Sequence, residues 1–504
     1  MKRNIKIVLG ISFLFLATRL FFIESIPGEW FGDISNVHEY VTEVLDGKWP
    51  FYFFQSPGPL YHYLITPIVM FSKNHGFETY KIASIMVSFL SLAAIFYFVK
   101  EISGKRLAYI TCLILSTAYL HLIWSRLGNS QIAIPLLSAL TGYYTVKYLK
   151  KKRFRDALLA GVSASSGWYL YPQTFILPFS FFIFYFVLFL FSRKTKSLLE
   201  PAIILFLMFL IFLPFLSIVK RQPDNFGPEG YVGQKVIPGF YMKPAEIIKT
   251  MLNRYLKIAG MFHLVGDDTF RINVVRKPHL DKISGIFFLA GFIYFLRKKR
   301  IKYLIFILWM LISLPLPSIS PAIRESEIPN TGRTIALMPY VYTLVAAGFF
   351  LLNEISGKLG IKIHLRALLI SVLFILTVYL NMRLYFVDYV WGLPDHNLAP
   401  GKIIAHYVDS YPKGVGLYFN SCCWGEWGAP DPKGVAYTLR KERFVDFSKQ
   451  ITACQEITYK PVLVMTDPGK PELLEKFKNC FPDSVTLELK HSQRGIISKF
   501  VYFK

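Results

Sequence analysis

Asp33 is the residue whose position most suggests chemistry. It follows the first long apolar segment, 5–23, and stands at the start of a stretch with helical periodicity. A carboxylate at a membrane surface can take a proton from an acceptor hydroxyl group as a general base. Aspartate is also well suited to cap the N-terminus of the helix that follows, and on the residue alone this is the simpler interpretation. Both interpretations stay open here.

The stretch after Asp33 predicts an amphipathic helix. Its apolar side chains recur at helical spacing, with acidic and hydroxyl side chains on the opposite face. Such a helix is suited to lie in the membrane interface. The apolar positions are Ile34, Val37, Val41, Val44 and Leu45.

Histidines near Asp33 raise the question of a metal. His38 and His62 have a spacing that imposes no ligand geometry, and the cysteines are not spaced as a CxxC zinc pair. We therefore predict no metal and no cofactor, with a divalent ion left open.

The composition places these residues in a membrane protein. Of 504 residues, 53% are hydrophobic and 17% aromatic, and the formal net charge is +25. So much apolar surface argues against both an ordinary soluble domain and a disordered chain.

Eleven apolar segments are long enough, or nearly so, to cross a hydrocarbon layer of about 30 Å. In the first segment Arg19 interrupts the apolar run, and no clear cleavage site follows. We therefore expect an uncleaved span rather than a signal peptide. A shorter apolar segment, 60–71, predicts an interfacial or re-entrant piece. The eleven segments are 5–23, 80–99, 107–124, 132–148, 157–171, 175–191, 202–219, 283–296, 303–318, 335–352 and 367–386.

Lysine and arginine are concentrated in alternate loops, which accounts for most of the net charge. By the positive-inside rule these loops are cytoplasmic. We therefore expect a multi-pass cell-membrane protein with a cytoplasmic N-terminus, and nucleic acid is not needed to explain the charge.

Two domains are predicted. Residues 1–390 form the membrane-embedded part, with external loops 24–79 and 220–282, and residues 391–504 form an extracytoplasmic α/β domain. The predicted elements of the second domain are helices at 402–408 and 471–479 and strands at 415–419, 461–466, 485–489 and 497–502.

Four cysteines lie in the predicted external domain, where an oxidising compartment would allow disulfides. Cys422, Cys423, Cys454 and Cys480 can pair in three complete ways, one of which needs a strained vicinal bridge. Cys112 lies within a span and is interpreted as a packing residue.

Several short motifs, in this order, resemble those of GT-C membrane glycosyltransferases related to family 39, which includes protein O-mannosyltransferases and lipid A aminoarabinose transferases. They are an outward Asp33, Gly47-Lys48-Trp49, Pro59-Leu60-Tyr61-His62-Tyr63, Trp124-Ser125-Arg126, Gly167-Trp168-Tyr169-Leu170-Tyr171, Gly266-Asp267, Arg271-Ile272-Asn273 and Pro329-Asn330-x-x-Arg333 with Met338-Pro339.

The resemblance implies a GT-C-like polytopic α-helical membrane protein with about eleven transmembrane helices. It implies transfer of a sugar, with inversion, from a polyprenyl-phosphate carrier to an acceptor outside the cytoplasm. Asp33 would be the general base. Arg126 and Arg333 would bind the donor phosphate, although each could instead snorkel to the interface or pair with Glu325 or Glu327.

Other candidate residues have alternative roles. Arg333 could simply pair with Glu325 or Glu327. Many relatives have Asp-Glu where this chain has Asp33 followed by Ile34, so a second carboxylate would have to come from Glu29, Glu39 or Asp267, if there is one. The candidates for contact with the substrate, or for charges of the external loops, are Glu39, Tyr61, His62, Asp267, Asp268 and Arg271.

The implied partners are the lipid-linked donor, membrane lipid and an unidentified glycan, lipid or protein acceptor. A lipid or glycolipid transporter is the main alternative, but the sequence shows no paired interruptions of its spans. An oligosaccharyltransferase is disfavoured because the predicted external domain lacks the Trp-Trp-Asp-Tyr-Gly motif.

Overall fold

The computed structural model describes residues 2–49, 58–72, 76–191, 198–221, 223–226, 242–420, 431–446, 454–466 and 471–504. The chain forms two compact units. Unit 1 comprises Met1–Phe21, Tyr40–Met70 and Lys81–Tyr389, and unit 2 comprises Phe22–Glu39, Phe71–Tyr80 and Val390–Lys504. The second unit thus includes two segments from the N-terminal part of the chain.

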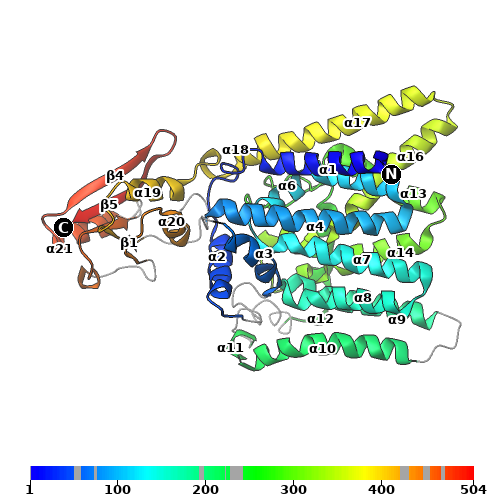
Figure 1. Cartoon of the computed structure of the whole chain (residues 1–504), viewed down its shortest axis with the longest axis horizontal. Helices are drawn as coiled ribbons and strands as arrows, with labels where there is room; N and C mark the ends of the chain where they lie inside the picture. Colours follow the sequence, from blue (N-terminus) through cyan, green and yellow to red (C-terminus); the bar gives the residue numbers. More distant parts are fainter. Residues whose placement is uncertain are drawn as a thin grey trace. The chain divides into compact units, whose positions relative to one another are not determined.

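Unit 1 is built from helices, the longer of which run side by side (Figure 1). Its described helices are α1 (Lys2–Leu20), α3 (Leu60–Met70), α5 (Lys105–Thr117), α6 (Tyr119–Ser125), α7 (Ile134–Lys151), α8 (Phe154–Ser165), α9 (Ile176–Leu190), α10 (Leu199–Arg221), α11 (Pro223–Phe226), α12 (Pro244–Gly260), α13 (Lys282–Arg297), α14 (Ile301–Ser313), α15 (Thr331–Thr334), α16 (Met338–Lys358) and α17 (Ile363–Arg383). Two further helices, α2 (Gly32–Leu45) and α4 (Phe77–Ser103), have residues in both units.

The eleven apolar segments fall on these helices, so their helical character is confirmed. Within the described residues, six helical stretches are long and apolar enough to cross a membrane by themselves, and α5 with α6 makes a seventh if this pair, bent by 66°, is one span. The protein is therefore a multi-pass membrane protein. The number of spans and the side on which the chain begins remain predictions.

The bend between α5 and α6 is held by polar side chains of α1. A helix that ends inside an apolar bundle leaves carbonyl groups without partners, and these must be satisfied within the protein. The Arg19 guanidinium donates to the carbonyl oxygens of Ser116 and Leu115, the latter at 3.2 Å, and Thr18 Oγ1 donates to Ser116 at 3.0 Å. The charged residue that interrupts the first apolar segment thus caps the broken helix.

Small residues allow α13 and α16 to pack backbone to backbone. A Cβ atom added at Gly291 would lie 2.1 Å from the Leu344 carbonyl oxygen, and one added at Gly348 would lie 2.1 Å from that of Phe287. Close packing at small residues is a common way for helices to associate in lipid. It fixes the position of α16, which follows the turn that carries Arg333.

Unit 2 contains a five-stranded mixed sheet of order β2-β1-β3-β5-β4. The β1 strand pairs in parallel with β2 and β3, whereas β5 pairs antiparallel with β3 and β4. The elements are α18 (Val390–Gly392), α19 (Pro400–Asp409), β1 (Gly416–Asn420), α20 (Pro432–Thr438), β2 (Val445–Asp446), β3 (Val462–Thr466), α21 (Pro471–Cys480), β4 (Val485–His491) and β5 (Gly495–Phe503).

Helices cover both faces of this sheet. Side chains of α19 and α20 pack with Leu417, Met465 and Phe500 on one face. On the other face, Phe477 of α21 packs with Val464 and other alternate strand residues. All six elements predicted for this region are confirmed. The short elements α20 and β2 were not predicted from the sequence.

One disulfide is described, between Cys454 and Cys480. It belongs to one of the pairings that the sequence left open, and Cys422 and Cys423 lie outside the described residues. Cys112 is a free, buried cysteine, as its interpretation as a packing residue requires.

Glu29 joins the segment after α1 to the start of α19. Its carboxylate accepts hydrogen bonds from the Trp30 amide at 3.1 Å and the Gly401 amide at 2.8 Å. Burial nevertheless raises the pKa of Glu29 to about 7, because the loss of hydration outweighs these two hydrogen bonds. Both oxygens are engaged, so Glu29 has a structural role within unit 2.

This shift predicts a pH-dependent stability for unit 2. Because the folded-state pKa of about 7 exceeds the reference value of 4.5, folded Glu29 retains a proton that the unfolded chain releases. Stability therefore falls as the pH rises through this window, by about 3 kcal/mol in total. Thermal unfolding should show that unit 2 is less stable at pH 8 than at pH 5. In Glu29→Gln this difference in stability should be smaller. Glu472→Gln, at an exposed position, is the control, and an unchanged slope in Glu29→Gln would contradict the assignment.

Candidate functional site

Asp33 lies in the first turn of α2. The Phe31 carbonyl accepts from the amides of Ile34 and Ser35, so Phe31 is the last residue before the helix and Asp33 is inside it. The side chain is partly exposed. A carboxylate in a first turn is favoured by the helix dipole. Asp33 therefore stabilises the helix end without being its N-cap, and its role as a base is not decided by this placement.

The apolar face of α2 does not lie open to lipid. Ile34, Val37, Val41 and Val44 are each at most 2% exposed. The predicted helix is confirmed, but these four apolar side chains pack inside the protein and do not face lipid. A position of the helix in the membrane interface stays a prediction. Amphipathic periodicity alone does not distinguish a protein core from a lipid surface.

Glu39 is engaged by α20. Lys433 Nζ lies 2.7 Å from Glu39 Oε1, and the Tyr437 hydroxyl donates to the same oxygen at 3.0 Å. One turn earlier on α2, the Ser35 hydroxyl donates to the Asp431 carboxylate. These contacts fasten α20 to α2 within unit 2, which gives Glu39 a structural role here.

Arg126 is fully buried, directly after α6. Its Nη1 donates to the Thr18 carbonyl at 3.3 Å, and its guanidinium lies 5.2 Å from the centre of the Tyr385 ring. A snorkelling arginine would keep its charged end in water, so the snorkelling interpretation does not fit this position.

Two tyrosines that the sequence analysis missed accompany Arg126. Tyr385 and Tyr389 lie one turn apart in the π-helical turn that continues α17, and both are buried. The Tyr385 hydroxyl has no hydrogen-bond partner among the described residues, whereas that of Tyr389 donates to the Arg271 carbonyl at 2.7 Å. Two tyrosines spaced by four residues at the end of the last span are the signal that could have identified them.

Arg333 lies in α15 and is paired with a carboxylate. Its Nη2 bonds to Glu327, whereas Nη1 is buried and has no partner in the described part of the chain. An unsatisfied buried donor costs about 1–3 kcal/mol, so an additional acceptor at Nη1 would be favourable. Arg333 therefore forms an ion pair with one of the two acidic neighbours that the sequence offered, Glu327. This pair leaves Nη1 of the guanidinium for another acceptor.

Asp267 anchors the turn that carries Arg333. The carboxylate is fully buried and accepts from the Thr331 amide at 2.8 Å, from the Thr331 hydroxyl, and from His279 Nε2 at 3.0 Å. Both oxygens are occupied within the protein. Asp267 thus supports Thr331, which stands two residues before Arg333. A role of Asp267 in substrate contact stays a prediction.

The remaining candidates occupy different surroundings. Asp268 is exposed and lies 3.6 Å from Arg276, and Arg271 is partly buried. Tyr61 and His62 are buried in α3. The Tyr61 hydroxyl bonds to Ser84 at 2.8 Å, and His62 Nδ1 lies 3.2 Å from the Gly58 carbonyl oxygen. Tyr61 and His62 thus connect α3 to its neighbours.

Motifs that are far apart in the sequence are neighbours in unit 1. A Cβ atom added at Gly332 would lie 2.8 Å from the Trp124 ring, and one added at Gly58 would lie 2.0 Å from the Tyr169 carbonyl. The Tyr119 hydroxyl donates to Asn273 at 3.0 Å. The segments before Arg126 and Arg333 therefore pack directly on each other.

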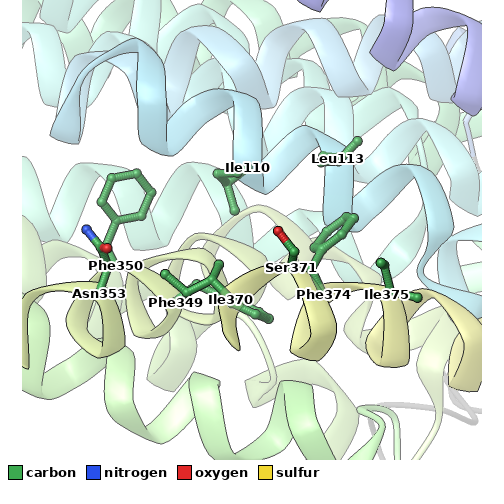
Figure 2. A pocket seen from close by; sticks show the side chains of 9 residues that line it. All are labelled: Ile110, Leu113, Phe349, Phe350, Asn353, Ile370, Ser371, Phe374 and Ile375. Carbon is green, nitrogen blue, oxygen red and sulfur yellow. The ribbon is translucent and has the colours of Figure 1, made fainter. Parts of the chain in front are cut away.

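A cavity of about 460 Å³ lies elsewhere in unit 1, among α5, α16 and α17 (Figure 2). It is lined by Ile110, Leu113, Phe349, Phe350, Asn353, Ile370, Ser371, Phe374 and Ile375. None of these side chains is titratable, so the cavity has no groups for acid-base chemistry or for charge stabilisation of a phosphate.

Tyr231, a polar residue of the predicted external loop 220–282, lies outside the described residues. Within those residues, no three histidine, cysteine, aspartate or glutamate side chains form a metal-binding group, and the absence of a metal stays a prediction.

This chain is similar in structure to ArnT from Cupriavidus metallidurans bound to undecaprenyl phosphate. The TM-score is 0.54 at 12% sequence identity, over 99% of this chain and 98% of that one. The chain has the GT-C glycosyltransferase fold. ArnT in the apo state gives the same TM-score and identity over 98% of each chain.

Other comparisons give a lower TM-score or match a smaller part of the chain. Residues 56–218 match the family described as dolichyl-phosphate-mannose-protein mannosyltransferase. The oligosaccharyltransferase of Archaeoglobus fulgidus in the apo form has a TM-score of 0.48 at 13% identity, over 94% of this chain and 71% of that one. Sequence comparison with curated proteins gives no significant match. The resemblance drawn from the motifs is confirmed at the level of the GT-C fold.

The contacts of Asp267 predict a sharp difference between two adjacent aspartates. Asp267→Asn should lower the free energy of unfolding by about 2–3 kcal/mol, because it removes the charge that three buried donors face. Asp268→Asn, at an exposed position, should change it by less than about 0.5 kcal/mol. Thermal unfolding in detergent measures both. Equal effects of the two substitutions would show that Asp267 does not support the turn.

Proposed function

We propose that the protein is a membrane glycosyltransferase that moves a sugar from a polyprenyl-phosphate carrier to an acceptor outside the cytoplasm. In the proposed step the acceptor oxygen bonds to the anomeric carbon while the bond from that carbon to the phosphate oxygen breaks. The electron pair leaves with the phosphate, and the acceptor proton passes to the Asp33 carboxylate. Attack opposite to the leaving group inverts the anomeric carbon.

The observation that carries this proposal is the likeness to ArnT along nearly the whole of both chains, together with the family match at residues 56–218. The ArnT structure contains undecaprenyl phosphate. For this chain we accordingly propose a polyprenyl phosphate as the carrier. The sugar, and whether the acceptor is a glycan, a lipid or a protein, are left open.

Arg126 and Arg333 are the residues we propose for the donor phosphate. Guanidinium groups bind phosphate oxygens through charge-assisted hydrogen bonds, which are stronger where water is excluded. Arg126 is fully buried, with its guanidinium over the Tyr385 ring, and Arg333 keeps Nη1 without a partner among the described residues. Each thus lies where an anionic oxygen would be stabilised.

The alternative, a lipid or glycolipid transporter, gains no support. Transporters of the common folds have broken helices at corresponding positions of two repeats. In the described part of the chain only the pair α5 and α6 is sharply bent. Its two halves are fastened by α1, which is expected of a rigid site.

Asp33→Asn should abolish transfer without unfolding the protein, because an amide cannot accept the acceptor proton. We expect the rate to fall by about 10²- to 10⁴-fold. The assay supplies labelled polyprenyl-phosphate sugars to the purified protein in lipid nanodiscs and follows label in the acceptor fraction.

Asp46→Asn is the matched control, since Asp46 is an exposed carboxylate near the other end of the same helix. Transfer by Asp33→Asn at the wild-type rate would remove Asp33 as the base. No transfer by the wild-type protein from any polyprenyl-phosphate sugar would overturn the proposed function as a whole.

A further inference from the structure

Two acidic side chains lie on one short turn before Arg333, and each contacts a different partner. The turn is the 3₁₀ segment Glu325–Glu327, which precedes α15. Glu325 faces α12, whereas Glu327 pairs with Arg333. The two acids of this turn thus have separate functions, which the sequence alone did not distinguish.

Glu325 fastens the turn to α12. Arg254 Nη2 lies 3.3 Å from Glu325 Oε2, Lys257 bonds to Glu325 Oε1, and the Arg254 guanidinium also donates to the Ser320 carbonyl. The hydrogen bond from Lys257 lowers the pKa of Glu325, so this carboxylate stays ionised. The turn is thereby fastened through Glu325, and these contacts do not involve the Glu327 side chain.

Glu327 is the more exposed partner of its pair. Its side chain is 35% exposed, compared with 12% for Arg333. When Glu327 leaves the arginine it can therefore be hydrated, and the arginine remains with two guanidinium nitrogens for another anion. Nη1, which has no partner in the described part of the chain, provides a first point of contact.

We propose that Glu327 exchanges with the phosphate of the lipid carrier at Arg333, so that it occupies the arginine whenever the site is empty and helps to expel the product. The proposal rests on the proposed function, because it takes Arg333 as a phosphate ligand. Glu327 is then a residue that sets affinity and release, and it takes no part in bond breaking.

The chemistry of the two lipid phosphates explains why such an exchange is useful. The donor is a phosphodiester with one negative charge, whereas the released polyprenyl phosphate is a monoester with a charge of about −1.5 to −2 at pH 7. Arginines that attract the donor therefore attract the product more strongly. A competing carboxylate within the protein lowers the affinity for both and speeds dissociation of the product.

The test compares four proteins in lipid nanodiscs: wild type, Glu327→Gln, Arg333→Ala and the double variant. The probe is polyprenyl phosphate, and its dissociation constant is measured by titration at fixed ionic strength. Glutamine keeps the size of the side chain and a hydrogen-bond acceptor, so the turn should be retained. A parallel assay gives kcat and KM with the polyprenyl-phosphate sugar.

Glu327→Gln should bind polyprenyl phosphate about tenfold more tightly. It should also lower the KM for the donor and lower kcat, because release of the product becomes slower. In the Arg333→Ala background the same substitution should change the dissociation constant by less than about twofold. This loss of the effect distinguishes exchange at one arginine from a general change of the electrostatic field.

Each contrary result has a defined meaning. Weaker or unchanged binding by Glu327→Gln, with Arg333→Ala still impaired, overturns the exchange and leaves the phosphate role of Arg333 intact. Equal tightening in both backgrounds also overturns it. Unchanged binding by Arg333→Ala removes the phosphate ligand itself, and with it both this inference and that part of the proposed function.

Discussion

Charged and polar groups inside an apolar helical bundle must find their partners within the protein, and this constraint determines the candidate site of unit 1. A buried charge without compensation is too costly to persist. Asp267 meets the requirement with three hydrogen-bond donors, and Arg19 meets it with the free carbonyls at the end of α5. Much of the geometry of the candidate site follows from these two sets of hydrogen bonds.

Each buried group positions one of the two candidate phosphate ligands. Arg19 and Thr18 hold the bend after α5, and Arg126 closes α6 immediately beyond that bend. Asp267 holds Thr331 at the start of α15, two residues before Arg333. Because Gly332 packs on Trp124, the two supports act on segments that are in contact. A site built on such fixed elements is pre-organised for an anion.

The sequence predicted what depends on local pattern. Apolar runs of about 20 residues located the helices, and short apolar runs located the strands of unit 2. The roles of Asp267 and Glu39 could not be predicted, because their partners are 64 and 394 residues away in the chain. The same holds for α2, whose apolar stripe has the period of an interfacial helix but is covered by protein. In the sequence Arg19 is only an interruption of the first apolar segment, since the broken helix that it caps is not visible in a hydropathy pattern.

The central claim is that Arg126 and Arg333, held by these supports, bind the phosphate of a polyprenyl carrier. An experimental structure with bound polyprenyl phosphate tests it most directly. We expect phosphate oxygens about 2.7–2.9 Å from guanidinium nitrogens of these two arginines. A phosphate bound at a place that neither arginine touches would contradict it.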